Sequence, residues 1–306
     1  VVSLLRNFSA PVNLEFNYSD EELAFLLQYE TNGFNQWQAT QTLLERILLN
    51  GHDATIYLQA MKKTIPTLID QDPLLVSRLF DVPTEGYLGS RIDSDYQPAK
   101  IQEQRNALLT KLAQEFGSFC KETYLSLDPS VQKEFSQAMG VRALKNIMLT
   151  MIARQGDESA FELADAQYKS TRNMSERLGA LKVLVWNDAP QAEAALIDFY
   201  MRFKDESLSM DQWFMVQAAH PQADAKTIEY LTSHPDYDLA VPNRIRSVSS
   251  GLNANPVNTW SFGVQHYIQL AQYLGEKSPI IVSRLLQVLS RWYTLAEPQR
   301  SQVKAD

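Results

Sequence analysis

The segment DESAFELADAQYKS, residues 157–170, is followed by SERLGALKVLVWN at 175–187 and by PQAEAALIDFYMRFK at 190–204. In each segment apolar residues recur every three or four positions, which is the spacing of one face of an α-helix. The residues expected to point inward are Phe161, Leu163, Ala164, Tyr168, Leu178, Leu181, Leu184, Val185, Leu196, Ile197, Phe199, Tyr200 and Phe203. The stretch therefore predicts three successive helices joined by loops of about four residues.

Helical hairpins of this length cannot bury an apolar stripe alone, so each must stack on its neighbours. The spacing resembles armadillo or HEAT repeats, although the period is shorter and the sequences are irregular. We therefore predict an all-α fold, built as a superhelical stack of helical hairpins. Such a stack has a concave face on which a ligand or a partner can bind.

Helix signals continue on both sides of this stretch. Ser19-Asp-Glu-Glu22 has the form of a capping box, in which the Ser and Glu side chains satisfy backbone amides at a helix start. Asp72-Pro73, Asp128-Pro129 and Ser278-Pro279 each place a capping residue before a proline that suits the first helical position. The segment Asp81–Pro98 holds two prolines and two glycines, and we expect a long surface connection there.

Residues 1–16 differ from the rest of the chain. Leu14 and Phe16 alternate with polar neighbours, which is the periodicity of a strand, and Ala10-Pro11 confines any pairing to a sheet edge. An isolated strand needs a sheet, and no other strand candidate follows. We predict that residues 1–16 are the end of a preceding β-sandwich domain with its linker. Residues 17–306 are then a C-terminal helical domain. A start at Val1 instead of Met fits a fragment or a processed product.

The composition is that of a globular protein, with 306 residues, 45% hydrophobic and 21% charged. The net charge is -8 and the longest basic cluster is Lys62-Lys63, which argues against a nucleic-acid partner. The apolar runs fall well short of the roughly 20 residues that cross a bilayer, so we expect no membrane span. Cys120 is the only cysteine and cannot form an intramolecular disulfide, which favours a reducing, cytoplasmic location.

Few residues are arranged for catalysis. A zinc peptidase needs convergent ligands, commonly two histidines one helical turn apart and a carboxylate. The chain has four histidines, and none of them stands in that pattern. They are His52, His220, His234 and His266. Glu158, Glu162 and Asp165 are three or four positions apart, but no Glu-x-x-His partner accompanies them, so a solvated helix face is the better interpretation. We predict no metal and no catalytic residue within this chain.

Three arginines are placed unusually. Arg244 and Arg246 stand two positions apart at a predicted helix start, so their side chains point to roughly opposite faces. At least one of them should contact a carboxylate, the backbone or a cavity. Arg284 borders the apolar stripe of the helix that begins at Ser278-Pro279. That stripe consists of Ile281, Leu285, Val288, Leu289 and Trp292. An arginine at such a border pairs with a buried acid, lies along apolar surface or faces a wet cavity.

Three segments carry a family resemblance. Met210-Asp-Gln-Trp-Phe214 and Pro242-Asn-Arg-Ile-Arg-Ser247 resemble stretches of the C-terminal helical domain of bacterial aminopeptidase N, a zinc metallopeptidase family of the gluzincin group. The opening Ser3–Val12 resembles the end of that family's small β domain. The resemblance implies a four-domain enzyme that removes N-terminal residues from peptides. It implies zinc as the cofactor of a preceding catalytic domain, and none in this chain.

In such enzymes the C-terminal domain encloses the active-site chamber and controls substrate access. By position, Arg246 and Arg284 match family arginines that line this chamber and reach the carboxylate end of a peptide. Ile280 matches a chamber position where relatives can carry a polar residue that touches substrate, and isoleucine departs from that pattern. The implied partners are the catalytic and β domains of the same polypeptide, and peptide substrates. Family members continue for another helix or two beyond Asp306.

Other interpretations stay open. A stand-alone helical-repeat scaffold would bind a protein or peptide partner in its concave groove. A helical enzyme with its own site is disfavoured, because no cluster of His, Asp and Glu converges. Trp213 and Phe214 fit either a domain boundary or the core.

Overall fold

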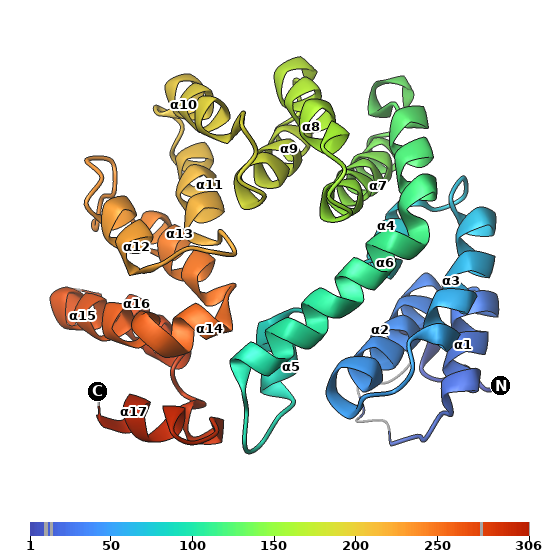
Figure 1. Ribbon diagram of the computed structural model, residues 1–306, viewed down its shortest axis with the longest axis horizontal. Coiled ribbons are helices and arrows are strands. Elements are labelled where there is room, and N and C mark those ends of the chain that lie inside the picture. The colour runs from blue at the N-terminus through green and yellow to red at the C-terminus, as the bar shows by residue number, and fades with distance from the viewer. Residues whose placement is uncertain (9–11, 13–14, 276–277, 306) are drawn as a thin grey trace. The chain divides into compact units, whose positions relative to one another are not determined.

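The computed structural model describes residues 1–8, 12, 15–275 and 278–305. Within those ranges the regular structure is helical, from α1 (Asp20–Tyr29) to α17 (Gln299–Ala305) in Figure 1. The β structure there is an isolated bridge between Tyr96 and Leu295. None of the helices in the described part combines the length and the apolar character that crossing a membrane requires. The predicted all-α fold is confirmed.

The chain divides into two compact units, and the first comprises Val1–Pro83 and Gln104–Ala160. Its helices are α1, α2 (Gly33–Asn50), α3 (Thr55–Leu68), α4 (Pro73–Leu79), the greater part of α6 (Pro98–Ser126) and α7 (Phe135–Arg154), with 3-10 turns at Arg6–Phe8 and Pro129–Val131. In this unit α1 packs against α2 and α3, and α4 packs against α7.

The second unit comprises Thr84–Glu103 and Phe161–Asp306. Its helices are α5 (Glu85–Ser90), α8 (Ser159–Ser170), α9 (Met174–Trp186), α10 (Ala192–Phe203), α11 (Ser207–Ala218), α12 (Ala225–Thr232), α13 (Pro242–Asn253), α14 (Pro256–Asn258), a π-helical turn at Thr259–Gly263, α15 (Val264–Leu274), α16 (Pro279–Gln287), a 3-10 turn at Trp292–Thr294, and α17. Here α9 packs against α10, α11 against α13, and α15 against α16.

The capping signals act where the sequence places them. Ser19 Oγ accepts a hydrogen bond from the Glu22 amide at 3.2 Å, and a Glu22 carboxylate oxygen accepts one from the Ser19 amide at 2.9 Å. Asp72 likewise caps α4 by accepting from the Leu75 amide at 2.9 Å. These contacts satisfy amides that have no partner within the helix. The Asp128-Pro129 signal starts only a 3-10 turn.

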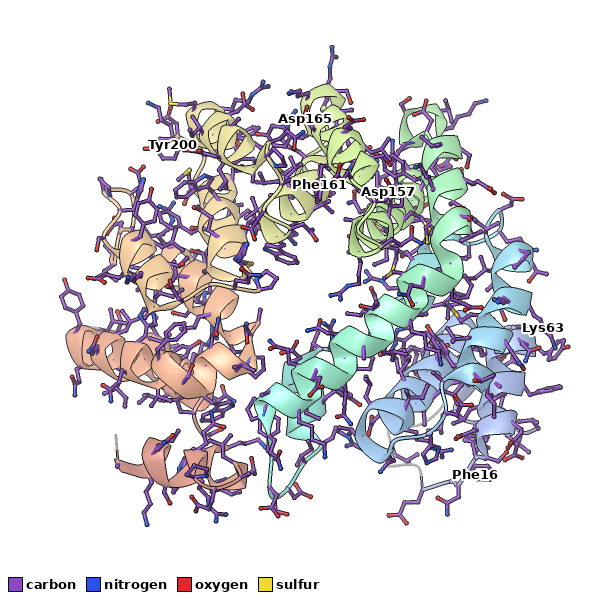
Figure 2. The ribbon with its side chains drawn as sticks, viewed as in Figure 1. Phe16, Lys63, Asp157, Phe161, Asp165 and Tyr200 are labelled. Carbon is purple, nitrogen blue, oxygen red and sulfur yellow. The ribbon has the colours of Figure 1, made fainter. Side chains whose placement is uncertain are left out.

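The three helices of the fold-deciding stretch form as α8, α9 and α10, within about two residues of their predicted bounds. Most of the predicted inward residues are buried or half-buried, but Ile197 is 57% exposed, so that prediction is wrong. Ile197 and the fully buried Phe199 are two positions apart, which turns them to nearly opposite sides of a helix. Asp165, labelled in Figure 2, pairs with Lys169 at 2.7 Å, and Glu158 and Glu162 are exposed, which agrees with a solvated acidic face.

The long surface connection expected at Asp81–Pro98 is also wrong. Thr84 Oγ1 accepts from the Tyr87 amide at 3.2 Å and starts α5. Tyr96 is buried, its amide donates to the Thr294 carbonyl at 2.8 Å, and its own carbonyl accepts from the Ala296 amide at 2.9 Å. A segment with many turn residues therefore packs into the second unit through its backbone.

One further expectation differs from the structure, and another concerns residues that the structure does not describe. The helix that starts at Pro279 ends at Gln287, so the stripe predicted to run on to Trp292 continues through turns instead. The strand pattern at residues 1–16 depends on Leu14 and on Ala10-Pro11, which lie outside the described residues. The assignment of residues 1–16 to a β domain stays a prediction.

A substitution at Gly89 tests the packing of α5. A Cβ atom on Gly89 would lie 2.6 Å from Cζ of Tyr96, whose buried ring has little room to move. We expect Gly89→Ala to lower the free energy of unfolding by about 1–3 kcal/mol. Gly86→Ala in the same helix adds a methyl group with no atom within 4 Å, and should be neutral or stabilise by up to about 1 kcal/mol. Urea denaturation followed by circular dichroism compares the two, and equal effects would contradict this packing.

Candidate functional site

Helix α13 carries two of the three residues singled out by the sequence. Pro242 occupies its first turn, where a missing N–H costs nothing and the fixed φ suits a helix. An apolar stripe at helical spacing turns one face of α13 inward, and it consists of Ile245, Val248 and Leu252. This stripe decides where Arg244 and Arg246 point.

Arg244 is buried and its charge is neutralised. Its Nε lies 2.8 Å from Oδ1 of Asp211 on α11, and the two side chains are 8% and 9% exposed. The guanidinium also donates to the carbonyl oxygen of Asp236 and lies 4.9 Å from the ring centroid of Phe214. Of the two arginines at the start of α13, Arg244 thus makes the predicted contact with a carboxylate.

Arg246, two positions further on, turns away from that buried cluster. Its side chain is exposed, and it donates to Oδ1 of Asn243 on the same helix. Within the described ranges no carboxylate lies close enough to form an ion pair with it. The charge of Arg246 is therefore available to a ligand.

Helix α16 carries the third arginine, Arg284, and Ile280, the other residue that the family resemblance places in the chamber. Leu285 is its buried anchor, at 4% exposure. Ile280 is 73% exposed, and Arg284 is exposed one position before Leu285. Arg284 has no hydrogen-bond or ion-pair partner among the described residues. Among the described residues, Arg284 therefore has no buried acid as a partner, and its side chain is in contact with solvent.

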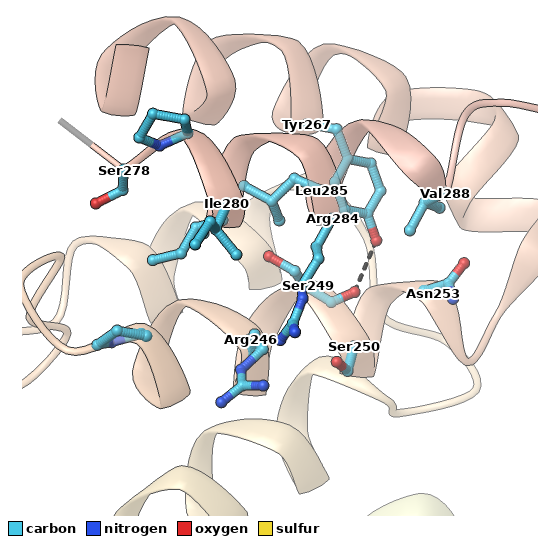
Figure 3. Close-up of a pocket in the computed structure, with 13 residues that line it drawn as sticks. Arg246, Ser249, Ser250, Asn253, Tyr267, Ser278, Ile280, Arg284, Leu285 and Val288 are labelled. Atoms are coloured by element: carbon cyan, nitrogen blue, oxygen red, sulfur yellow. Dashed lines mark hydrogen bonds between the residues drawn. The ribbon is translucent and has the colours of Figure 1, made fainter. Parts of the chain in front are cut away.

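All three predicted residues line one cavity of about 560 Å³, which α13, α15 and α16 enclose. We call it the arginine pocket. It is lined by Pro242, Arg246, Ser249, Ser250, Asn253, Tyr267, Ser278, Pro279, Ile280, Ile281, Arg284, Leu285 and Val288. Figure 3 shows Arg246 and Arg284 entering it from α13 and α16.

The far wall of the arginine pocket is polar and held in place. Tyr267 Oη donates to the Ser249 carbonyl at 2.7 Å, a bond that ties α15 to α13 and is drawn in Figure 3. Burial raises the pKa of Tyr267, so its hydroxyl stays protonated and keeps donating. The hydroxyl of Ser249 is buried and has no hydrogen-bond partner among the described residues.

The lining defines what the arginine pocket can bind. Its described lining residues include two guanidinium groups and no Asp or Glu, so the charge that they place there is positive. Guanidinium groups bind carboxylates through paired, charge-assisted hydrogen bonds. Apolar walls from Ile281, Leu285 and Val288 flank them. The geometry suits a small anion that carries an apolar part.

Sequence reasoning found the charged residues of this pocket and missed the polar ones. Ser249, Ser250 and Asn253 follow Arg246 at spacings of three, four and seven, so they share its helix face, and that spacing is a usable signal. Tyr267 gave none, because a different helix brings it to the pocket. Trp213 and Phe214 are buried, which settles their role in favour of the core.

The side chains that could bind a metal ion, those of His, Cys, Asp and Glu, lie outside the described lining of the arginine pocket. The described part of the chain holds no group of three or more His, Cys, Asp or Glu side chains placed to bind a metal ion. His234 lies in an aromatic cluster, with ring centroids 5.3 Å from Trp213 and 5.6 Å from Phe214. Cys120 is buried, and burial raises its pKa to about 12, so the thiol is a packing residue.

The fold defines a class of protein, a helical-repeat domain of the armadillo type, and its second unit holds a cavity lined by two arginines. The family described as "Domain of unknown function (DUF3458_C) ARM repeats" matches residues 20–306, and this chain belongs to that family. The helical-repeat stack predicted from the sequence is confirmed.

Curated relatives are aminopeptidases. The chain is 29% identical over 305 residues to aminopeptidase N of Escherichia coli K12. It is 30% identical over 313 residues to aminopeptidase N of Caulobacter vibrioides. Each match covers 95% of this chain and 35% of the relative, so the chain spans about a third of their length. The predicted resemblance to bacterial aminopeptidase N is confirmed.

A solved structure shares the fold. The crystal structure of Legionella pneumophila aminopeptidase A in complex with aspartic acid superimposes with a TM-score of 0.84 at 22% sequence identity. The match covers 99% of this chain and 38% of that chain.

The buried pair between Asp211 and Arg244 can be tested by removing one or both charges. Asp211→Leu leaves an unpaired guanidinium inside the protein, and we expect a loss of about 3–5 kcal/mol in the free energy of unfolding. The double variant Asp211→Leu with Arg244→Met should recover most of that loss, since neither charge of the pair is then left buried. Asp165→Ala, which breaks a surface pair, is the control and should change stability by less than about 0.5 kcal/mol. A double variant as unstable as the single one would contradict the account.

Proposed function

We propose that this chain is the non-catalytic C-terminal portion of a zinc-dependent aminopeptidase, which releases N-terminal amino acids from peptides. In this proposal the helical domain encloses the active-site chamber and controls substrate access. The relationship to aminopeptidase N over 95% of the chain supports it. Because only 35% of those relatives is matched, the reaction would depend on other parts of the polypeptide, namely its catalytic and β domains.

One observation carries the proposed role of this chain. Arg246 and Arg284 come from different helices, line the same cavity, and have no carboxylate partner among the described residues. A peptide bound by its N-terminus at a catalytic centre presents its C-terminal carboxylate at the other end. The two arginines would attract and orient that carboxylate. Ile280 would add an apolar contact at the rim, since it is exposed and lines the cavity.

Zinc belongs to this proposal only through the rest of the enzyme. The described residues of this chain do not fit a zinc ion, because they bring no three ligand side chains together. We therefore propose that the catalytic domain of the same polypeptide holds the metal. Zinc supplies an activated water for amide hydrolysis, and the residues described here would position the peptide. We also propose a cytoplasmic location, which a single buried thiol suits.

The arginines can be tested in the full-length protein with two kinds of substrate. Arg246→Ala or Arg284→Ala should weaken turnover of a tripeptide more than turnover of an aminoacyl-anilide, because the anilide lacks a carboxylate. A charge-assisted contact contributes about 1.5–3 kcal/mol, roughly ten- to a hundredfold, and solvent around exposed arginines favours the lower end. The expected change is about tenfold in kcat/KM for the tripeptide, mainly through KM. Arg202→Ala, on the surface of α10, is the matched control.

Equal losses on both substrates, together with a lower Tm, would contradict a carboxylate contact. They would assign the arginines to structure, as for Arg244. A stand-alone scaffold gives a third result, in which the full-length protein has no peptidase activity at all.

The proposal that another domain holds the zinc gives a second test. The purified 306-residue chain should release no N-terminal amino acid from a peptide, because its described residues form no cluster that could hold a metal ion and activate a water. The full-length protein should release it and lose the activity on treatment with a chelator, and added zinc should restore the activity. Chelator-sensitive release by the 306-residue chain alone would overturn the proposed division.

A further inference from the structure

A second cavity of about 560 Å³ lies on the other side of Arg246. We call it the methionine pocket. Helices α9, α11 and α13 enclose it, and its lining residues are Met174, Leu178, Leu208, Ser209, Asp211, Gln212, Met215, Asn243, Arg246, Ser247 and Ser250. Four large apolar side chains contribute to it, two of them methionines, whose flexible thioethers adapt to ligands of different shape.

Helix α13 forms the ridge between the two cavities. Asn243, Arg246, Ser247 and Ser250 follow one another at spacings of three, one and three, so they form one stripe of the helix, which faces the methionine pocket. The lining of the arginine pocket on α13 forms the adjacent stripe, made of Pro242, Arg246, Ser249, Ser250 and Asn253. Arg246 and Ser250 belong to both stripes. A ligand that contacts Arg246 therefore borders both cavities at once.

The charges differ between the two sides of this ridge. The methionine pocket is lined by the charged residues Asp211 and Arg246, and Asp211 is paired with Arg244 at 2.8 Å. Its one uncompensated charge, among the residues that line it, is that of Arg246. The arginine pocket adds Arg284 to the same ridge. Positive charge is thus concentrated at the ridge, with apolar surface beyond it in the methionine pocket.

We propose that the methionine pocket binds the apolar side chain of the C-terminal residue of a short peptide. This proposal rests on the proposed function, in which the peptide's carboxylate contacts Arg246. A C-terminal residue carries its carboxylate and its side chain on one Cα atom. When the carboxylate lies on the ridge, the side chain is directed into a neighbouring cavity. An apolar side chain gains free energy there by leaving water, and a serine side chain gains little.

The methionines report directly on this pocket. Two of the eight methionines of the chain, Met174 and Met215, line it. The protein is labelled with 13C at the methionine methyl groups, and Met→Leu variants assign the signals. N-acetyl-Ala-Ala-Leu is then titrated, because its blocked N-terminus prevents turnover. We expect saturable shifts of Met174 and Met215, and no shift of the exposed Met201 on α10 or the buried Met61 of the first unit.

Two matched probes separate the side chain from the carboxylate. N-acetyl-Ala-Ala-Ser keeps the carboxylate and should bind about five- to tenfold more weakly, since the apolar burial is lost. N-acetyl-Ala-Ala-Leu amide keeps the side chain and should lose about tenfold through the missing charge. Leu208→Ser should reduce the preference for the Leu peptide about threefold. Ile197→Ser is the control, because Ile197 is a comparably exposed apolar residue that lines neither cavity.

The outcomes distinguish the two proposals. Equal binding of the Leu and Ser peptides, with a loss for the amide, overturns the methionine pocket and leaves the carboxylate role of Arg246 intact. Equal binding of the acid and the amide overturns the carboxylate role and the inference that rests on it. Shifts confined to Met201 or Met61 also overturn the inference, because they place the peptide elsewhere. A side-chain preference that Leu208→Ser reduces and Ile197→Ser preserves supports it.

Discussion

The buried ion pair between Arg244 and Asp211 fixes the start of α13, and the ligand-facing residues depend on it. The pair joins α11 to α13, and its two residues lie 33 positions apart in the sequence. Near the other end of α13, Gly251 allows close approach to α11, since a Cβ there would lie 2.6 Å from Cβ of Ala218. These two contacts leave α13 little freedom to rotate. Arg246 is therefore held on the solvent-facing side of the helix.

The pair also holds the segment that leads into α13. Arg244 donates to the carbonyl of Asp236, and the carboxylate of Asp236 accepts from Tyr200 Oη at 2.6 Å. The rings of Trp213, Phe214 and His234 pack together beside it. One oxygen of Asp211 is buried without a hydrogen bond among the described residues, so the cluster is not fully satisfied. We infer that this pair serves more to fix one arrangement of the helices than to add stability.

The sequence predicts where helices begin better than it predicts what each helix packs against. Caps such as Ser19 and Asp72 depend on residues within one turn, so local reasoning finds them. The alternation of Arg244 and Arg246 also predicts that one of them is pinned. It does not say which one, because Asp211 is remote in sequence. At Asp81–Pro98 the local turn signals were outweighed by tertiary contacts of Tyr96 with the segment near Thr294. The three site residues came from a family resemblance, whereas Tyr267 became visible only in three dimensions.

Two neighbouring arginines on one helix thus have opposite physical situations. Arg244 is desolvated, and its charge is cancelled by a carboxylate at 2.8 Å. Arg246 and Arg284 stay in contact with water, which screens the repulsion between two unit charges to about 1 kcal/mol even at about 4 Å. An uncancelled charge can be kept in a pocket at little cost only when solvent reaches it. The same solvent limits the strength of any single contact with a ligand. Selectivity at this ridge must therefore come from combining charge with shape, and the two cavities beside Arg246 supply the shape.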